Sequence, residues 1–162
     1  MPAQLNINEY YVDNIIVQSN DHFKRTEIGT CGIHVDFDIK RNKDNPLDFL
    51  ISMLIELNKK DEDFELAEYR ILLNITGIYS FAEGTDDATI NNMIAPSGLS
   101  ILYGVARGVL SQITGNCRHG KFILPTLNFM EIIKNKFKKL AESETATPLV
   151  EEPPPTKKKK IA

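Results

Sequence analysis

The feature that most constrains the fold is a stretch in the second half of the chain that would be apolar on nearly every side of a helix. It begins after Thr85, which can cap a helix, and Asp86 and Asp87 in its first turns favour the positive end of the helix dipole. One side carries Leu99, Leu102, Tyr103, Ala106, Leu110 and Ile113, and the other carries Ile101, Val105 and Val109. Such a helix must be covered on both sides. We expect a kink or break near Ala95, because Pro96 interrupts the pattern.

Four segments with strand periodicity precede this helix, over residues 10–18, 33–40, 49–58 and about 64–81. The first mixes aromatic and β-branched residues with polar ones, which suits a strand near an edge. The other three each have one apolar face: Ile33, Val35, Phe37 and Ile39; Phe49, Ile51, Met53, Ile55 and Leu57; Tyr69, Ile71, Leu73 and Ile75. Because the connections are short, with residues 59–63 read as a hairpin connection, we expect an antiparallel meander.

A second helix is expected after Asn128, which can form a capping box with Glu131. Its apolar face holds Phe129, Ile132, Ile133, Phe137 and Leu140. The composition then shifts to Glu, Thr, Pro and Lys. We therefore expect one α+β domain over residues 1–141, followed over residues 142–162 by a disordered tail that includes Lys157–Lys160.

A four-stranded sheet can cover only one side of the long apolar helix. We therefore expect an oligomer in which this helix lies between subunits. Gly104 and Gly108 lie one turn apart and would let another backbone approach closely. The alternative is a helix buried entirely by the chain's own tails.

Composition and charge restrict the partners. The chain of 162 residues is 42% hydrophobic and 25% charged, which is typical of a soluble globular protein. With a net charge of −3 and no dense basic stripe in the expected domain, a nucleic-acid partner is not expected. The N-terminal residues lack the pattern of a signal peptide, and the apolar stretches fall short of a membrane span. A cytoplasmic protein without stable membrane insertion is expected.

The sequence offers little for catalysis. It has no glycine-rich phosphate loop, no nucleophile elbow and no pair of histidines at metal-binding spacing on a helix. Cys31 with His34 and Cys117 with His119 are the best metal candidates, but structural zinc sites usually show tighter paired ligands. We expect no catalytic residue, cofactor or metal. A metal-dependent enzyme at these four residues is the alternative.

Four sequence motifs occur in an order that resembles a known family. They are Thr76-Gly77-Ile78-Tyr79-Ser80-Phe81, the proline-containing segment Ala95-Pro96-Ser97-Gly98-Leu99-Ser100-Ile101-Leu102-Tyr103, the run Val105-Ala106-Arg107, and Phe122 with Leu124-Pro125-Thr126-Leu127-Asn128-Phe129. Their order, and the order of the expected elements over residues 9–141, resembles the SecB family of protein-export chaperones.

The resemblance implies a homotetramer, built as a dimer of dimers, in which two eight-stranded sheets enclose the long helices. It implies that unfolded client polypeptides bind in extended form along grooves, without ATP. Positions matching the client groove are Val35, Phe37, Ile39, Ile133, Phe137 and Leu140, although Phe37 and Ile39 can equally be ordinary core. Positions expected at subunit contacts are Tyr69, Ile71, Leu73, Ile75, Tyr103, Gly104 and Gly108. The sequence alone does not decide between a dimer and a tetramer.

The sequence departs from the family at its contacts with the SecA motor, where exporting members present acidic residues. The matching positions here are Asn14, Gln18 and Leu72, so attraction for the basic, zinc-binding tail of the motor should weaken. One hypothesis is a holdase that keeps preproteins unfolded for export. The other is a dedicated chaperone in a toxin–antitoxin system, protecting an aggregation-prone antitoxin and so controlling the toxin. The lost acidic residues favour the second slightly.

Overall fold

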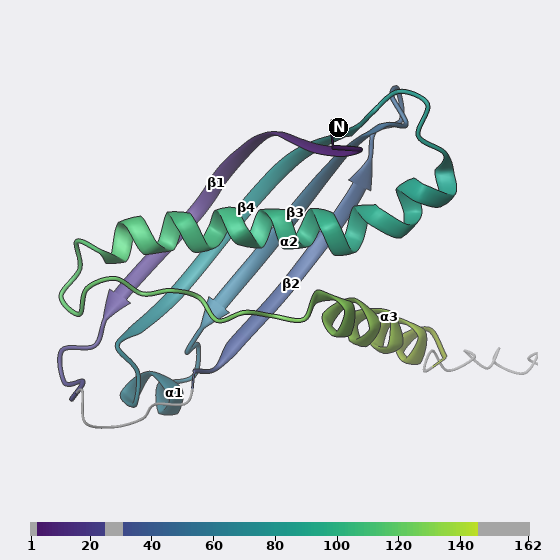
Figure 1. Ribbon diagram of the computed structural model, residues 1–162. Coiled ribbons are helices and arrows are strands. Elements are labelled where there is room, and N and C mark those ends of the chain that lie inside the picture. The colour runs from purple at the N-terminus through teal and green to yellow at the C-terminus, as the bar shows by residue number, and fades with distance from the viewer. Residues whose placement is uncertain (1–2, 25–30, 146–162) are drawn as a thin grey trace, which may run out of the picture. The chain divides into compact units, whose positions relative to one another are not determined.

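The computed structural model describes residues 3–24 and 31–145 and shows an α+β fold. Its elements, in chain order, are β1 (Leu5–Ser19), β2 (Ile33–Arg41), β3 (Asp48–Leu57), α1 (Asp61–Glu65), β4 (Tyr69–Phe81), α2 (Asp87–Thr114) and α3 (Phe129–Thr145). The chain divides into two compact units, residues 1–129 and residues 130–162, which are described separately. The first unit holds the sheet and α2 (Figure 1).

The four strands form one antiparallel sheet in the order β1-β4-β3-β2. Strands β2, β3 and β4 pair consecutively as predicted, but the prediction of a simple meander is wrong for β1. This strand pairs with β4 from Leu5 opposite Phe81 to Ser19 opposite Tyr69. The physical reason is length, because β1 and β4 are the two longest strands and pair along almost their whole extent. The edge position predicted for β1 is confirmed.

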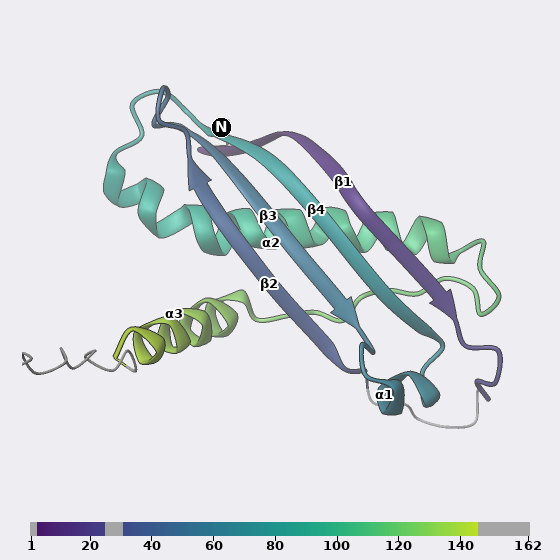
Figure 2. The same cartoon turned by 180° about the vertical axis from the view of Figure 1, so that it is seen from behind.

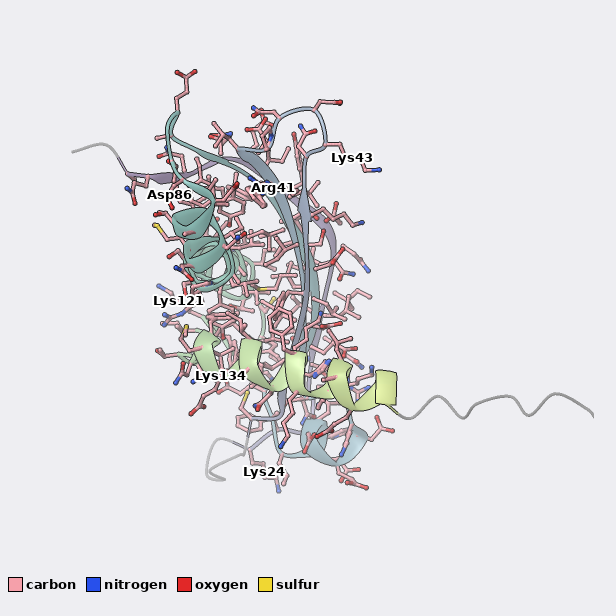
Figure 3. The ribbon with its side chains drawn as sticks, turned by 90° about the vertical axis from the view of Figure 1, so that its right-hand side faces the viewer. Lys24, Arg41, Lys43, Asp86, Lys121 and Lys134 are labelled. Atoms are coloured by element: carbon pink, nitrogen blue, oxygen red, sulfur yellow. The ribbon has the colours of Figure 1, made fainter. Side chains whose placement is uncertain are left out.

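One face of the sheet forms the core beneath α2 (Figure 1). Every second residue of β4 is buried, from Tyr69 to Phe81, and the register puts the apolar residues of β3 on the same face. The predicted apolar faces of β2, β3 and β4 are therefore confirmed. The edge-on view in Figure 3 shows α2 on one side of the sheet, with Arg41 and Asp86 at the same end. There Arg41 Nη2 forms an ion pair of 2.7 Å with Asp87.

Two glycines allow α2 to approach the sheet closely. A Cβ on Gly98 of α2 would lie 2.4 Å from Ile51 Cδ1, and one on Gly77 of β4 would lie 3.1 Å from Leu102 Cδ1. Tyr79 fills the space beside them and donates a hydrogen bond of 2.9 Å from its hydroxyl to the Gly98 carbonyl. Burial raises the pKa of Tyr79, so this hydroxyl stays a donor. Gly77 thus leaves room for Leu102 of α2, and Tyr79 forms a hydrogen bond with the backbone of the same helix.

Helix α2 differs from its prediction at two points. Its N-cap is Asp86, whose carboxylate accepts a hydrogen bond of 2.9 Å from Thr89 N–H, and not Thr85. The helix also continues through Pro96, so the expected break does not occur, although the ribbon in Figure 1 bends in its first part. Burial of Ile94 and Leu99 against the sheet on both sides of Pro96 offsets the hydrogen bond that proline removes.

By length and composition alone, α2 is the one helix of the described residues that could cross a membrane. The expectation that every apolar stretch is too short is corrected to that extent. The helix lies on the sheet, however, and residues along its length form the core. Core helices of soluble proteins pass the same criterion, so the finding is weak evidence for a membrane span.

The remaining elements shift two predicted boundaries, the start of the fourth strand and the end of the last helix. The helix α1 occupies part of the charged connection and the expected start of the fourth strand, so β4 begins only at Tyr69. The last helix begins after Asn128, as predicted, but runs to Thr145, so residues 142–145 are helical and not part of a disordered tail. Residues 146–162, with Lys157–Lys160, lie outside the described residues.

Candidate functional site

The first candidate surface is the rim of the core along β2, which we call the β2 strip and define as Val35, Phe37 and Ile39. These residues pair with Ile55, Met53 and Ile51 and face the same side of the sheet as α2. Phe37 is buried at 8% exposure, whereas Val35 and Ile39 are half-buried. In the described sheet β2 has a neighbouring strand on one side only. Phe37 is therefore a core residue, whereas Val35 and Ile39 leave part of their apolar surface exposed on an edge strand.

The other half of the predicted groove lies on α3, in the second unit. Ile133 is half-buried there, and Phe137 and Leu140 are exposed. The helix separates this apolar side from a basic side that contains Lys134, visible in Figure 3. Joining the β2 strip and α3 into one groove stays a prediction, because the two units are described separately.

The predicted subunit contact on β4 requires correction. Tyr69, Ile71, Leu73 and Ile75 are at most 1% exposed and form the chain's own core beneath α2. They could reach another subunit only if α2 left the sheet. The alternation of β4 was read correctly, but periodicity does not say which layer covers an apolar face.

The predicted contact residues on α2 divide into two kinds. Gly104 and Gly108 are exposed, and no heavy atom lies within 4 Å of a Cβ built on either. Tyr103 is buried, donates a hydrogen bond of 2.7 Å to the Pro125 carbonyl and packs edge-on against Phe129. Burial raises the pKa of Tyr103 to about 12. The glycines therefore remain available to a second helix, whereas Tyr103 anchors the segment that follows α2.

The opposite face of the sheet, seen in Figure 2, is not covered by α2. The register places there the three positions that match motor contacts of the SecB family by resemblance: Gln18 pairs with Arg70, Asn14 with Asn74, and Leu72 with Ile16. The structure thus places these positions on one face of the sheet, with Arg70 opposite Gln18 and Glu56 opposite Leu72. Ile16, which is 55% exposed, was missed by the sequence analysis because two bulges break the alternation of β1, one between Ile7 and Glu9 and one between Val12 and Asn14.

The candidate metal ligands have other environments. His119 Nε2 lies 2.7 Å from the Asn20 carbonyl oxygen, and its ring packs edge-on against Phe23 and Tyr69. Burial, with a contribution from Asp63, raises the pKa of the Cys31 thiol. Within residues 3–24 and 31–145, no three His, Cys, Asp or Glu side chains gather as metal ligands would. His119 instead ties the segment after α2 to the end of β1.

A pocket of about 370 Å³ lies between the start of β2 and α1. Its lining is Gly32, Ile33, His34, Glu56, Lys59, Lys60 and Asp63. Glu56 is nearly buried and forms an ion pair of 2.8 Å with Lys59 Nζ. The mixture of two lysines with two carboxylates favours no single class of small molecule.

Comparison with known proteins supports the fold. No protein-family model matches the chain. An uncharacterized protein of Methanocaldococcus jannaschii is 24% identical over 131 residues, covering 81% of this chain and 83% of the relative. The fold matches the Mycobacterium tuberculosis SecB-like chaperone in complex with a ChAD peptide from the HigA1 antitoxin, with a TM-score of 0.59. This chain has a SecB-like fold.

The SecB-like match covers 77% of this chain and 91% of the mycobacterial protein, at 11% sequence identity. At that identity the likeness concerns the fold alone. A protein of unknown function from Streptococcus agalactiae is also similar, with a TM-score of 0.40 and 12% identity, over 75% of this chain and 97% of that protein.

Proposed function

We propose that this protein is a non-enzymatic, ATP-independent chaperone that holds one unfolded polypeptide in extended form, and that its client is an antitoxin. The observation that carries the proposal is the SecB-like fold shared with a chaperone whose structure holds an antitoxin peptide. A partly exposed apolar strip at a strand edge in this chain supports it.

The β2 strip suits an extended client for two physical reasons. A segment lying along an edge strand can form backbone hydrogen bonds, and its alternate side chains then face the half-buried Val35 and Ile39. Burial contributes about 25 cal/mol per Å², so about 300 Å² of apolar surface would contribute about 7 kcal/mol before the costs of association. Binding along an edge strand selects segments whose alternate residues are apolar, and we expect an aggregation-prone antitoxin to contain such segments.

The outer face of the sheet favours the antitoxin over the export role. At Asn14, Gln18 and Leu72 it presents amides and a leucine in place of carboxylates. Without carboxylates at these three positions, the long-range electrostatic attraction between this surface and a basic motor tail should be weaker. Export of preproteins is the second candidate function, supported by the motif resemblance. In either role we propose a cytoplasmic homo-oligomer in which α2 packs between copies through Gly104 and Gly108.

The test is recovery of bound polypeptides on the tagged full chain from its native host, with identification by mass spectrometry. One dominant small partner, encoded beside this protein, is expected. Many secretory precursors together with SecA would favour the export role, and recovery of no polypeptide would contradict a chaperone.

Matched variants connect the capture to the β2 strip. Ile39→Asp should reduce client recovery several-fold, because it places a charge among apolar contacts. Lys40→Asp adds a carboxylate at the next residue, on the opposite face of the same strand, and should leave recovery unchanged. Thermal unfolding of both variants establishes that they fold. Equal recovery with both would remove the strip from the binding surface.

A further inference from the structure

The two edges of the described sheet differ in their regularity. Strand β1, at one edge, is interrupted by two bulges where it pairs with β4. Strand β2, at the other edge, pairs with β3 without any shift of register, from Ile33 opposite Leu57 to Arg41 opposite Phe49 (Figure 2). Bulges discourage the addition of a further strand, whereas a long regular edge favours it. Strand addition is therefore easiest along β2, and control of strand addition matters most there.

The hydrogen bonds at both ends of β2 establish which backbone groups point to its open side. The N–H of Asn58 donates to the Gly32 carbonyl at 2.7 Å, and the N–H of Asn42 donates to the Asp48 carbonyl at 2.9 Å. In an antiparallel pair of strands, residues bonded to the partner strand alternate with residues whose backbone groups point away from it. The even-numbered residues of β2 therefore bond to β3. The N–H and C=O groups of its odd-numbered residues, which include the whole β2 strip, point to the open side.

A side chain of β2 itself occupies the middle of this open edge. Phe37 is the central residue of the nine in β2, and its N–H donates a hydrogen bond of 2.9 Å to Oδ1 of Asp36. Asp36 is exposed, and its position in the register places it on the outer face of the sheet. A charged oxygen accepts a stronger hydrogen bond from an amide than a neutral carbonyl does. The carboxylate of Asp36 therefore competes with any strand that approaches the Phe37 N–H.

We propose that Asp36 is a specificity-determining residue that controls the addition of a client strand to β2, an inference that rests on the proposed holdase function. An incoming strand needs the Phe37 N–H for one of its own carbonyl groups, so it must displace the carboxylate. The exchange replaces a charge-assisted hydrogen bond with a neutral one and returns the carboxylate to water. A segment offsets this cost only when it buries enough apolar surface on Val35 and Ile39. Asp36 thus excludes segments that match the β2 strip poorly.

Asp38, two residues further along β2, gives a matched comparison. It shares the outer face with Asp36 and is also exposed, but its carboxylate lies 3.5 Å from Lys40 Nζ. Replacing either aspartate with alanine changes the net charge by the same amount. The replacement at Asp36 also removes the acceptor of the Phe37 N–H. The pair of variants therefore separates the effect of this hydrogen bond from the effect of charge.

Amide hydrogen exchange of the full chain, followed by NMR, tests whether Asp36 holds the Phe37 N–H in solution. The Phe37 amide should exchange several-fold more slowly in the native protein than in Asp36→Ala, because the variant lacks the acceptor. Asp36→Asn keeps an acceptor oxygen without the charge, and Asp38→Ala keeps Asp36 itself, so both should resemble the native protein. Equal exchange of the Phe37 amide in the native protein and Asp36→Ala would overturn the proposal.

Binding of a short labelled peptide that alternates valine with threonine, measured by fluorescence anisotropy, tests the control of strand addition. Asp36→Ala should bind this peptide several-fold more tightly than the native protein, whereas Asp36→Asn and Asp38→Ala should bind it like the native protein. N-methylation of every second peptide amide blocks backbone hydrogen bonds on one side of the peptide strand. The gain in affinity should therefore be lost with one of the two alternately methylated peptides and kept with the other.

The outcomes separate this proposal from the proposed function. Equal affinity of the peptide for the native protein and Asp36→Ala would overturn the role of Asp36 and leave the holdase function standing. A peptide that binds neither the native protein nor any variant would contradict strand addition at β2, and with it both proposals. Thermal unfolding establishes that the variants fold. Asp36→Val also removes the acceptor and suits a strand, so it should reproduce the result of Asp36→Ala if alanine destabilises the edge.

Discussion

Leu72 and Leu73 are neighbours in β4, yet their side chains lie in opposite environments. Leu73 is fully buried beneath α2, whereas Leu72 is half-buried on the outer face beside Ile16. The family resemblance assigns Leu73 to subunit assembly and Leu72 to a motor contact. In the structure Leu73 belongs to the core of one chain, so its first role is the stability of that chain.

Leu73→Ala should lower the free energy of unfolding by about 2–5 kcal/mol, because it removes buried methyl groups and leaves a cavity. Leu72→Ala, the matched control, should cost well under half as much, since that side chain is partly exposed. Urea unfolding of both variants measures the difference. Equal, small losses would mean that β4 is not covered by α2 in solution.

Asp86 makes the start of α2 sensitive to acid. Hydrogen bonds from the Thr89 N–H and hydroxyl lower the pKa of Asp86 below its ordinary value. A lowered pKa in the folded state means that the stabilisation is complete above the ordinary aspartate pKa and is lost as the pH falls through the lowered value.

We therefore expect the melting temperature of the native protein to fall more between about pH 6 and about pH 3 than that of Asp86→Asn, which keeps a cap but does not titrate. Calorimetry at both pH values gives the comparison. Identical falls in the two proteins would show that the cap carries no pH-dependent stabilisation.

At the scale of elements, α2 and the sheet fit because glycine removes a side chain where they approach most closely. Gly98→Ala should cost about 1–3 kcal/mol through overpacking against Ile51, even though alanine favours a helix by about 1 kcal/mol. Ser97→Ala, at the preceding residue, makes a helix-favouring change without this clash. Denaturant unfolding should therefore separate the two variants in opposite directions, and a stabilised Gly98→Ala would contradict the close approach.

The sequence predicted the apolar face of each strand better than it predicted which strands pair. Alternation identified the apolar faces of β2, β3 and β4, because one face of each strand is buried and the pattern records this directly. It could not assign β1 to β4, since pairing across the sheet depends on strand length and on the connection through residues 20–32. Of the kink or break expected at Pro96, the break does not occur, because packing of Ile94 and Leu99 is a tertiary effect that the sequence pattern does not record. For the candidate site, the sequence predicted Val35 and Ile39, which are half-buried on an edge strand, but it could not predict the exposed Ile16, because the bulges of β1 depend on register.

At the scale of the whole molecule, the sheet covers one side of α2 and leaves its other side exposed. The sheet buries Leu99, Leu102, Ala106 and Leu110, while Gly104 and Gly108 face away from it with open space around them. Apolar residues beside them, such as Val105 and Val109, are only half-buried. An exposed helix side with two glycines one turn apart and half-buried valines beside them allows close packing of a second helix, which is the physical basis of the proposed oligomer.

Gly108→Leu tests the proposed packing of α2 between copies, because it should preserve the fold of one chain but disrupt an assembly. In a single chain the leucine meets no neighbouring atom and raises helix propensity by up to about 1 kcal/mol, so the fold should be kept. In an assembly packed through α2, the same side chain separates the helices and should give a smaller species. Light scattering after size-exclusion chromatography measures the mass, with Lys121→Leu as a control that adds an exposed leucine outside α2. A variant with the mass of the native protein would place the subunit contact elsewhere, with the edge strand β1 as the next surface to test.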